Sequence, residues 1–264
     1  MLLRTLRTLG LLLLLPAGLA LAASETPARL NRGAWSDFYG TLGERPVVVS
    51  LFPRESGELV GSYLFTDTET SEKIALVGMR GADGTVVLSH DSSGGTVADF
   101  QGSLMMSDGD PRLRGHFTYA GTDGRFALDA VLRSMSFGVE ADRRYNVVHA
   151  DDAALEAYVG RLKAAILAGD RAWVADQLAF PASVSVGRKR AKVASRKAFV
   201  EAWFDRIFHP QALRSLRSAR TVNLPVSNGG IMFNNGMIWI FSTQQRPKGF
   251  PPGPPRLYID WLSS

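Results

Sequence analysis

The sequence predicts two domains, an all-β antiparallel meander that curls into a half-barrel and an α+β domain after it, and three observations carry this fold class. Apolar runs of about six to eight residues, separated by Gly- and Asp-containing turns, fill residues 35–137, as in short antiparallel strands. The pattern lapses in the charged, aperiodic residues 136–150. Beyond them, apolar residues recur with the period of an amphipathic helix. We therefore place the domains at residues 33–137 and 150–264.

The first domain is defined by its apolar runs and by glycines inside three of them. The runs are residues 47–52, 59–65, 74–77, 86–88, 100–105, 113–119 and 126–132. Those at LVGSYLF (59–65), FQGSLM (100–105) and LRGHFTY (113–119) share an apolar-x-Gly-polar-apolar pattern. A glycine within a strand marks a bend, a bulge or a close backbone approach, and a curled sheet needs such bends. We expect a meander of about seven or eight strands that forms a half-barrel.

The second domain begins with helices. One apolar stripe has the spacing of an amphipathic helix and consists of Leu155, Val159, Leu162 and Ile166. Asp151 or Asp152 can cap the start of this helix, and Gly169 can end it. Asp170 and Ser195 can cap two further helices.

The rest of the second domain reads as strands. Residues 182–186 and 221–226 are strand candidates, and residues 229–240 form a hairpin around Asn235-Gly236, which is the strongest short hairpin signal. A closing strand, LYIDWL (257–262), alternates between two faces. It places Leu257, Ile259 and Trp261 on one face and Tyr258 and Asp260 on the other. Helices followed by several strands are an α+β pattern.

Three segments carry a resemblance to a known family. They are GDRAWVADQLAFPASVSV (169–186), SRKAFVEAWFDRIFHP (195–210) and GGIMFNNGMIWI (229–240). In this order they resemble the NTF2-like (cystatin-like) domains of small exported bacterial proteins, over about residues 150 to 264. The resemblance implies helices packed on a curved sheet to form a cone. The first half is similar to the β-meander found beside such domains in envelope proteins.

The first residues have the layout of a secretory signal peptide. Arg4 and Arg7 precede an apolar run centred on residues 11–15, and Ala20-Leu21-Ala22 fits a cleavage site after Ala22. The run is short for a bilayer span, which needs about 20 residues; an uncleaved anchor is the alternative. We expect a signal peptide over residues 1–22 and a periplasmic or secreted mature chain with no transmembrane span.

Composition excludes several classes of protein. The chain has no cysteine, which rules out disulfides, thiolate chemistry and a lipid anchor on cysteine. Loss of Arg4 and Arg7 would lower the formal charge from +5 to +3. That charge permits weak attraction to anionic envelope polymers but is no nucleic-acid footprint.

A basic run is the first candidate binding surface. GRKRAKVASRK (187–197) and a later helical turn together supply a patch for an anionic partner, which consists of Arg188, Lys189, Arg190, Lys192, Arg214 and Arg217. Candidate partners are lipopolysaccharide phosphate, phospholipid headgroups or an acidic protein. A solvated surface is the alternative reading. Aromatic residues are not interleaved with these charges, so nucleic acid is not expected as a partner.

No catalytic motif stands out in the sequence. The four histidines lack the spacing of a metal site, so neither a metal nor a cofactor is expected. The family resemblance implies a carboxylate or histidine base with a tyrosine donor inside the cone, and Tyr258 and Asp260 are the catalytic candidates because they share a strand face. A dry cone would raise the pKa of Asp260. The face with Ile259 and Trp261 is the more apolar one and is expected to point into the interior. Asp260 would then lie outside the cone, which favours a non-catalytic protein.

The hairpin IMFNNGMIWI (231–240) is the second candidate surface, because its strands are apolar on both faces and so need cover on both sides. One face can meet the helix stripe of Val200, Trp203, Phe204 and Ile207. The other must meet the first domain, a partner or a ligand. The residues concerned are either core or the lining of a pocket or interface, and they are Met232, Phe233, Met237, Trp239 and Trp203. A small apolar ligand or an envelope protein would suit them.

These features favour an exported, non-catalytic binding or structural protein of the bacterial envelope. Two alternatives remain open. One is an NTF2-like hydro-lyase or isomerase that acts on a small apolar molecule. The other is an inhibitor or immunity protein that masks an envelope-targeting enzyme.

Overall fold

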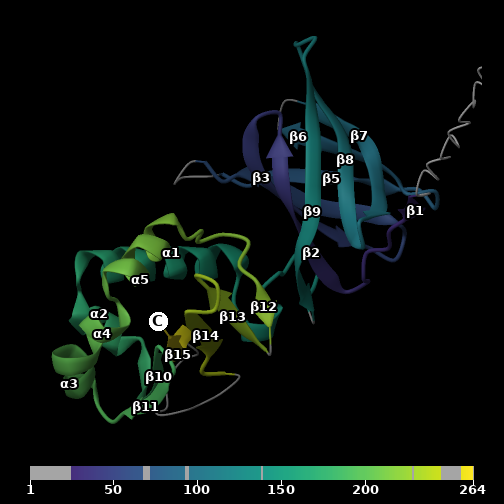
Figure 1. The fold of residues 1–264 in the computed structure, drawn as a ribbon. Coiled ribbons are helices and arrows are strands. Elements are labelled where there is room, and N and C mark those ends of the chain that lie inside the picture. Colours follow the sequence, from purple (N-terminus) through teal and green to yellow (C-terminus); the bar gives the residue numbers. More distant parts are fainter. Residues whose placement is uncertain are drawn as a thin grey trace, which may run out of the picture.

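The computed structural model describes residues 25–67, 72–92, 95–137, 139–227, 229–244 and 257–263. The expected signal peptide, residues 1–22, lies outside the described residues. The chain forms two parts, an antiparallel β-barrel and a mixed α+β part with a six-stranded sheet (Figure 1).

The first part is a closed barrel of eight antiparallel strands. They follow the chain order and are β2 (Ala34–Leu42), β3 (Arg45–Pro53), β4 (Glu58–Phe65), β5 (Ile74–Arg80), β6 (Thr85–Ser92), β7 (Gly95–Ser107), β8 (Asp110–Tyr119) and β9 (Arg125–Phe137). A short strand, β1 (Thr26–Pro27), pairs with β7. The meander is confirmed, but the half-barrel was wrong. β2 pairs with β9 from Ala34↔Phe137 to Leu42↔Leu128, and this pairing closes the sheet on itself.

Glycines permit the close approach of neighbouring barrel strands, as the repeated Gly pattern predicted. Gly102 on β7 lies opposite Gly115 on β8. A Cβ added to Gly102 would lie 2.1 Å from the carbonyl oxygen of Arg114, and one added to Gly61 would lie 2.1 Å from that of Ser50. No side chain fits at these positions, so the strands can curve there. The interior of the barrel holds apolar side chains that include Phe38, Phe100 and Phe117.

The α+β part is built around a six-stranded sheet. Its helical elements are η1 (Asn146–Val148), α1 (Asp152–Ala168), α2 (Arg171–Asp176), α3 (Arg196–Ala198), the π-helical turn η2 (Phe199–Trp203), α4 (Phe204–Ile207) and α5 (Pro210–Ser218). Its strands are β10 (Leu178–Val186), β11 (Lys189–Val193), β12 (Val226–Ser227), β13 (Gly230–Phe233), β14 (Ile238–Ser242) and β15 (Leu257–Ser263). The sheet order is β11-β10-β15-β14-β13-β12, and β10 pairs with β15 in parallel.

The helix caps confirm the sequence reading. The Asp151 carboxylate accepts from Ala154 N at 3.1 Å at the start of α1, and Gly169 ends α1 in the left-handed conformation at φ 74°. Asp170 caps α2 by accepting from Trp173 N at 3.0 Å. Ser195 caps α3. Each cap satisfies a backbone N–H that the first helical turn leaves without a partner.

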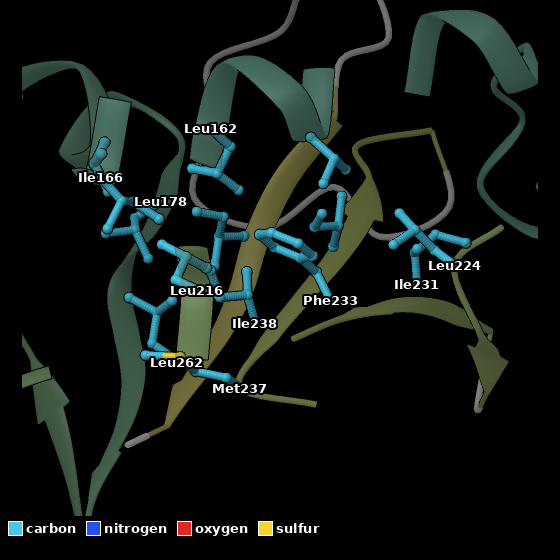
Figure 2. Packing of buried hydrophobic residues seen from close by; sticks show 14 of the residues in the cluster. Leu162, Ile166, Leu178, Leu216, Leu224, Ile231, Phe233, Met237, Ile238 and Leu262 are labelled. Atoms are coloured by element: carbon cyan, nitrogen blue, oxygen red, sulfur yellow. The ribbon is translucent and has the colours of Figure 1, made fainter. Parts of the chain in front are cut away.

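The inner face of the sheet packs against the helices in one hydrophobic core. Leu162 and Ile166 of α1 meet Phe233, Ile238 and Leu262 of the sheet, and all five are buried (Figure 2). The predicted stripe of the third helix joins this core through Phe204 and Ile207, with Val200 and Trp203 at its margin.

The two parts share core and polar contacts, so they form a continuous packed body. Trp35 and Phe52 of the barrel belong to the hydrophobic core of the α+β part. Their ring centroids lie 5.6 Å apart. The Trp35 indole also donates to the carbonyl of Glu140 at 3.1 Å. Ser136 on β9 accepts from Val226 N on β12 at 2.9 Å, which joins barrel and sheet directly.

Residues 189–193, for which the sequence predicted no secondary structure, form the edge strand β11, because Ala191 and Val193 supply an apolar face that packs on the core. Two local expectations need correction. Of the expected strand at residues 221–226, only Val226 pairs in the sheet. In the closing strand, Asp260 is an extra residue between the pairs Ile240↔Ile259 and Trp239↔Trp261. This bulge reverses the alternation of faces.

Candidate functional site

A cleft of about 510 Å³ lies between the barrel and the α+β part. Barrel strands β2 and β9 contribute one wall, and α5, the segment after it and the β13–β14 turn contribute the other. The lining consists of Tyr39, Arg133, Ser134, Ser215, Ser218, Ala219, Arg220, Val222, Asn223, Leu224, Pro225, Met232, Asn234 and Asn235. The lining therefore combines hydroxyls, amides and two guanidinium groups with a few apolar side chains.

Arginines dominate the electrostatics of this cleft. Arg220 Nη2 donates to the Tyr39 hydroxyl at 2.5 Å, and its guanidinium lies 5.0 Å from the centre of the Tyr39 ring. Its Nη1 is buried and has no hydrogen-bond partner among the residues that the structure describes. Arg133 pairs with Asp110 at 3.3 Å, but its side chain is 59% exposed, so this pair adds little stability. Among the described residues that line the cleft, none is acidic. The cleft is therefore positively charged.

A buried polar network fixes the back wall of the cleft. Asn223 adopts a left-handed φ of 49°, and its side-chain amide donates to Ser50 Oγ at 3.1 Å and to Ser62 Oγ at 3.3 Å on the barrel. Leu224 N donates to the Tyr145 hydroxyl at 2.9 Å, and Arg144 Nε donates to the Leu224 carbonyl at 3.1 Å. Asn223 is thus held by the barrel, and Leu224 is held by Arg144 and Tyr145 from the segment that follows the barrel.

The centre of this network is the ion pair between Arg144 and Asp37. Arg144 Nη2 and Nη1 donate to the two carboxylate oxygens at 2.7 and 3.1 Å, and the side chains are 3% and 1% exposed. Burial is the largest single influence on the pKa of Arg144 and acts to lower it, but the charge and the hydrogen bonds of Asp37, with smaller contributions from Tyr145 and Tyr39, together outweigh it, and the net shift is upward. Ser50 Oγ donates to the same carboxylate at 2.7 Å. The pair is therefore bidentate and almost completely shielded from solvent.

Glu156 is a second junction between the two parts. Its Oε1 accepts from Lys73 Nζ of the barrel at 2.8 Å, from the Tyr145 hydroxyl at 2.9 Å and from Asn223 N at 3.1 Å. Burial raises the pKa of Tyr145 well above its usual value, so this hydroxyl stays protonated and donates to Glu156. The network leaves Asn223 with little freedom.

Two further cavities occur in the α+β part. One of about 280 Å³ adjoins the cleft, shares Ser215, Asn234 and Asn235 with it, and reaches His209 and Met237. The hydrogen bond from Ser215 Oγ to Asn234 Oδ1 at 2.8 Å lies on the shared wall. The other cavity, of about 410 Å³, is separate and is lined by Val148, His149, Ala150, Asp151, Ala154, Tyr158, Gln177, Ser242 and Leu257.

The five residues proposed from the sequence to line a pocket or interface lie in different places. Phe233 is fully buried in the core, Met237 is buried beside the small cavity, and Trp203 packs at the core margin. Met232 lines the cleft. Trp239 lies on the outer face, packed on the small cluster of Ala179, Phe241 and Tyr258. These five residues therefore do not line one pocket.

The basic residues named from the sequence are all exposed but do not form one patch. Arg188, Lys189, Arg190 and Lys192 lie on and beside β11, and Arg214 and Arg217 lie on α5. Figure 1 shows β11 and α5 at opposite ends of the α+β part. The sequence grouped these residues only because they share a positive charge.

The catalytic candidates also separate. Tyr258 is fully buried in the outer-face cluster, where its ring centroid lies 6.3 Å from that of Phe241. Asp260 is half-buried at the bulge. Neither lines the cleft or the two further cavities described above. The parity argument that paired them fails because the bulge interrupts the alternation.

Sequence reasoning missed most of the cleft. Tyr39, Arg133 and Asn223 come from segments far apart in the chain, and none belongs to a motif. The left-handed Asn234 and Asn235, at φ 50° and 55°, were the detectable signal, because consecutive asparagines before glycine favour that conformation in a tight turn.

The described part of the chain contains neither a metal-binding cluster nor a membrane-spanning helix. No group of three or more His, Cys, Asp or Glu side chains there could hold a metal ion. No helix there is long and apolar enough to cross a membrane. No protein-family model matches the chain, and neither the curated proteins nor the solved structures yield a match. Any function must therefore be inferred from the site itself.

Proposed function

We propose that the chain is an exported, non-catalytic binding protein of the bacterial envelope that holds an anionic ligand in the cleft between its two parts. The observation that carries this proposal is Arg220. A buried donor without a partner costs about 1–3 kcal/mol, and Nη1 of Arg220 is such a donor. An anion that accepts from it would remove the cost, and Arg133 in the same cleft would add a second charge.

The lining supports binding rather than turnover. None of the described residues around the cleft is a histidine, aspartate or glutamate that could act as a general base. Amides and hydroxyls of Ser215, Ser218 and Asn235 can instead orient a ligand through hydrogen bonds. The buried network behind Asn223 preorganises this wall, which lowers the cost of binding.

We also propose that the α+β part has the NTF2-like fold. Two helices, a strand pair, further helices and four more strands follow in the order that the resemblance implies. The parallel contact of β10 with β15 at the centre of the sheet is consistent with it. Export and periplasmic or secreted localisation rest on the sequence of residues 1–22. Cell fractionation, with detection of the mature N-terminus by mass spectrometry, tests both.

The cleft is tested by calorimetric titration of residues 23–264 with phosphate, citrate and glucuronate. We expect binding of at least one anion, and Arg220→Gln should weaken it at least about tenfold, because a charge-assisted hydrogen bond contributes about 1.5–3 kcal/mol. Arg214→Gln is the matched control, since Arg214 is exposed and lies outside the cleft lining. Equal affinities of the two variants would refute the assignment of Arg220.

A second candidate function rests on the separate cavity of about 410 Å³. His149 and Tyr158 line it, and these are the base and donor types that an NTF2-like hydro-lyase or isomerase would use. Asp151 also lines it, but its carboxylate caps α1. Turnover of small apolar enones or hydroxyacyl compounds that disappears in His149→Gln, with the fold intact, would support this function; no turnover by the wild-type chain would exclude it for those substrates.

A further inference from the structure

The outer face of the six-stranded sheet carries an unbroken row of partly accessible side chains. Successive pairings link Lys192 to Ser183, Ser183 to Trp261, Trp261 to Trp239 and Trp239 to Met232. Residues paired across strands lie on the same face of a sheet. We call these five residues the outer row. Lys192 is exposed and the other four are half-buried, whereas the neighbouring row of Val184, Leu262, Ile238 and Phe233 is fully buried on the inner face.

The middle of the outer row is aromatic and well supported. The Trp239 ring stacks on Phe241 with centroids 6.4 Å apart and planes 15° apart. A Cβ built at Gly236 would lie 3.7 Å from Trp239 Nε1 and 3.8 Å from Met232 Sδ, so these two side chains meet over the hairpin turn. Trp261 lies beneath Arg190, whose guanidinium carbon is 5.4 Å from the indole ring. The two indoles are therefore held by neighbouring side chains.

Positive charge lies at both ends of the outer row. At the β11 end, Arg190 and Lys192 are exposed. At the other end, Met232 also lines the cleft that holds Arg220 and Arg133. Four steps between adjacent strands, each of about 4.8 Å, give a row of about 19 Å. The charges are thus spaced for an extended molecule rather than for a single small anion.

We infer that the outer row and the cleft together bind a linear acidic polysaccharide. The inference rests on the proposed function, because the cleft forms one end of this surface. The negatively polarised face of an indole attracts the C–H groups on the flat side of a sugar ring. Arginine pairs with the carboxylate of a uronic acid through two hydrogen bonds. The hydroxyls and amides of Ser183, Ser218 and Asn235 suit sugar hydroxyls.

An acidic polysaccharide fits this surface better than a nucleic acid does. Single-stranded nucleic acids carry a phosphate at every nucleotide, and proteins bind them with a continuous positive groove. Along the outer row itself, Ser183 and Met232 are the neighbours of the two tryptophans. Arg190 reaches over Trp261 from the β11 end, and the arginines of the cleft lie at the other end, so the positive charge does not form a continuous groove. A formal charge of +5 over the whole chain is also small.

The test compares a mannuronate oligomer that can span about 19 Å with monomeric glucuronate, each titrated into residues 23–264. Arg190→Gln/Lys192→Gln changes two exposed residues at the β11 end. Lys197→Gln/Arg206→Gln is the charge-matched control, with two exposed residues on the helical side. We expect the oligomer to bind more tightly than the monomer, and the Arg190/Lys192 variant to lose about tenfold in oligomer affinity with monomer affinity unchanged.

Other outcomes separate failure of this inference from failure of the proposed function. If monomer and oligomer bind equally and only Arg220→Gln weakens both, the cleft stands and the outer row is refuted. If neither sugar binds and the cleft binds phosphate or citrate instead, the inferred polysaccharide ligand is refuted and the proposed anion-binding function stands. If no anion binds, both proposals fall. If an oligothymidylate of the same length binds more tightly than the mannuronate oligomer, the partner is a nucleic acid and the polysaccharide is refuted. Trp261→Leu, which keeps an apolar side chain, should also lower oligomer affinity.

Discussion

Replacement of Arg144 by methionine would leave the Asp37 carboxylate buried and without its cationic partner. Arg144→Met removes both hydrogen bonds to Asp37, at 2.7 and 3.1 Å, and the bond from Nε to the Leu224 carbonyl at 3.1 Å. Among the described residues, only Ser50 Oγ would still donate to the carboxylate. Methionine fills part of the volume, so the loss is mainly electrostatic.

The size of the expected loss in the free energy of unfolding follows from the burial of the pair. Both side chains are at most 3% exposed, and breaking such a pair by removing one partner costs about 3–5 kcal/mol. Asp37→Asn alone should cost a similar amount, because it leaves the guanidinium unpaired. The double variant Asp37→Asn/Arg144→Met leaves no unpaired charge, so its cost should fall short of the sum of the single variants by about 2–3 kcal/mol.

The assay is equilibrium unfolding of residues 23–264 in urea, followed by circular dichroism and tryptophan fluorescence. Coincident transitions by the two probes are needed before a free energy of unfolding is derived. A cost below about 1 kcal/mol for Arg144→Met would refute the reasoning, since it would mean that water reaches the site. Additive costs in the double variant would show that the two charges do not interact.

Further predictions concern the barrel and α1. Gly102→Ala should destabilise the chain by more than about 3 kcal/mol, since its Cβ would lie 2.1 Å from a backbone oxygen. Gly160→Ala, whose Cβ would meet nothing within 4 Å, should stabilise α1 by about 0.5–1 kcal/mol; thermal unfolding compares the two, and a reversed order would contradict the packing argument. The hydrogen bond from Arg112 lowers the pKa of Asp129 below its usual value. The ionised carboxylate therefore stabilises the fold above its unfolded pKa, and this contribution is lost as the pH falls through the folded pKa. Arg112→Gln should flatten the acid limb of a plot of urea midpoint against pH, and an unchanged limb would refute the role of the pair.

Local signals in the sequence predicted the elements well where one physical cause dominates. Asp151, Asp170 and Ser195 each cap a helix as expected, because a cap depends on the adjacent backbone alone. The glycines in the repeated strand pattern mark close strand approaches for a similar reason. These features are set within a few residues and can be read without a partner.

Features set by distant partners could not be predicted. Closure of the barrel depends on pairing between β2 and β9. Nothing in the sequence of either strand indicates that the other is its partner. One inserted residue, Asp260, reversed the faces expected for the closing strand and moved Trp261 to the outer face. The cleft needs Tyr39, Arg133 and Arg220 from three separate segments. Local periodicity carries no information about any of these long-range contacts.

The position of β15 sets the order in which the newly made chain can fold. β15 lies between β10 and β14, so residues 257–263 complete the middle of a sheet whose other strands were synthesised earlier. The barrel, in contrast, has all its strands once residue 137 has emerged from the ribosome. Until β15 arrives, the edges of β10 and β14 are open to pairing with other chains. The α+β part can therefore complete its sheet only after the barrel has all its strands, and its open edges can pair with other chains until β15 is in place.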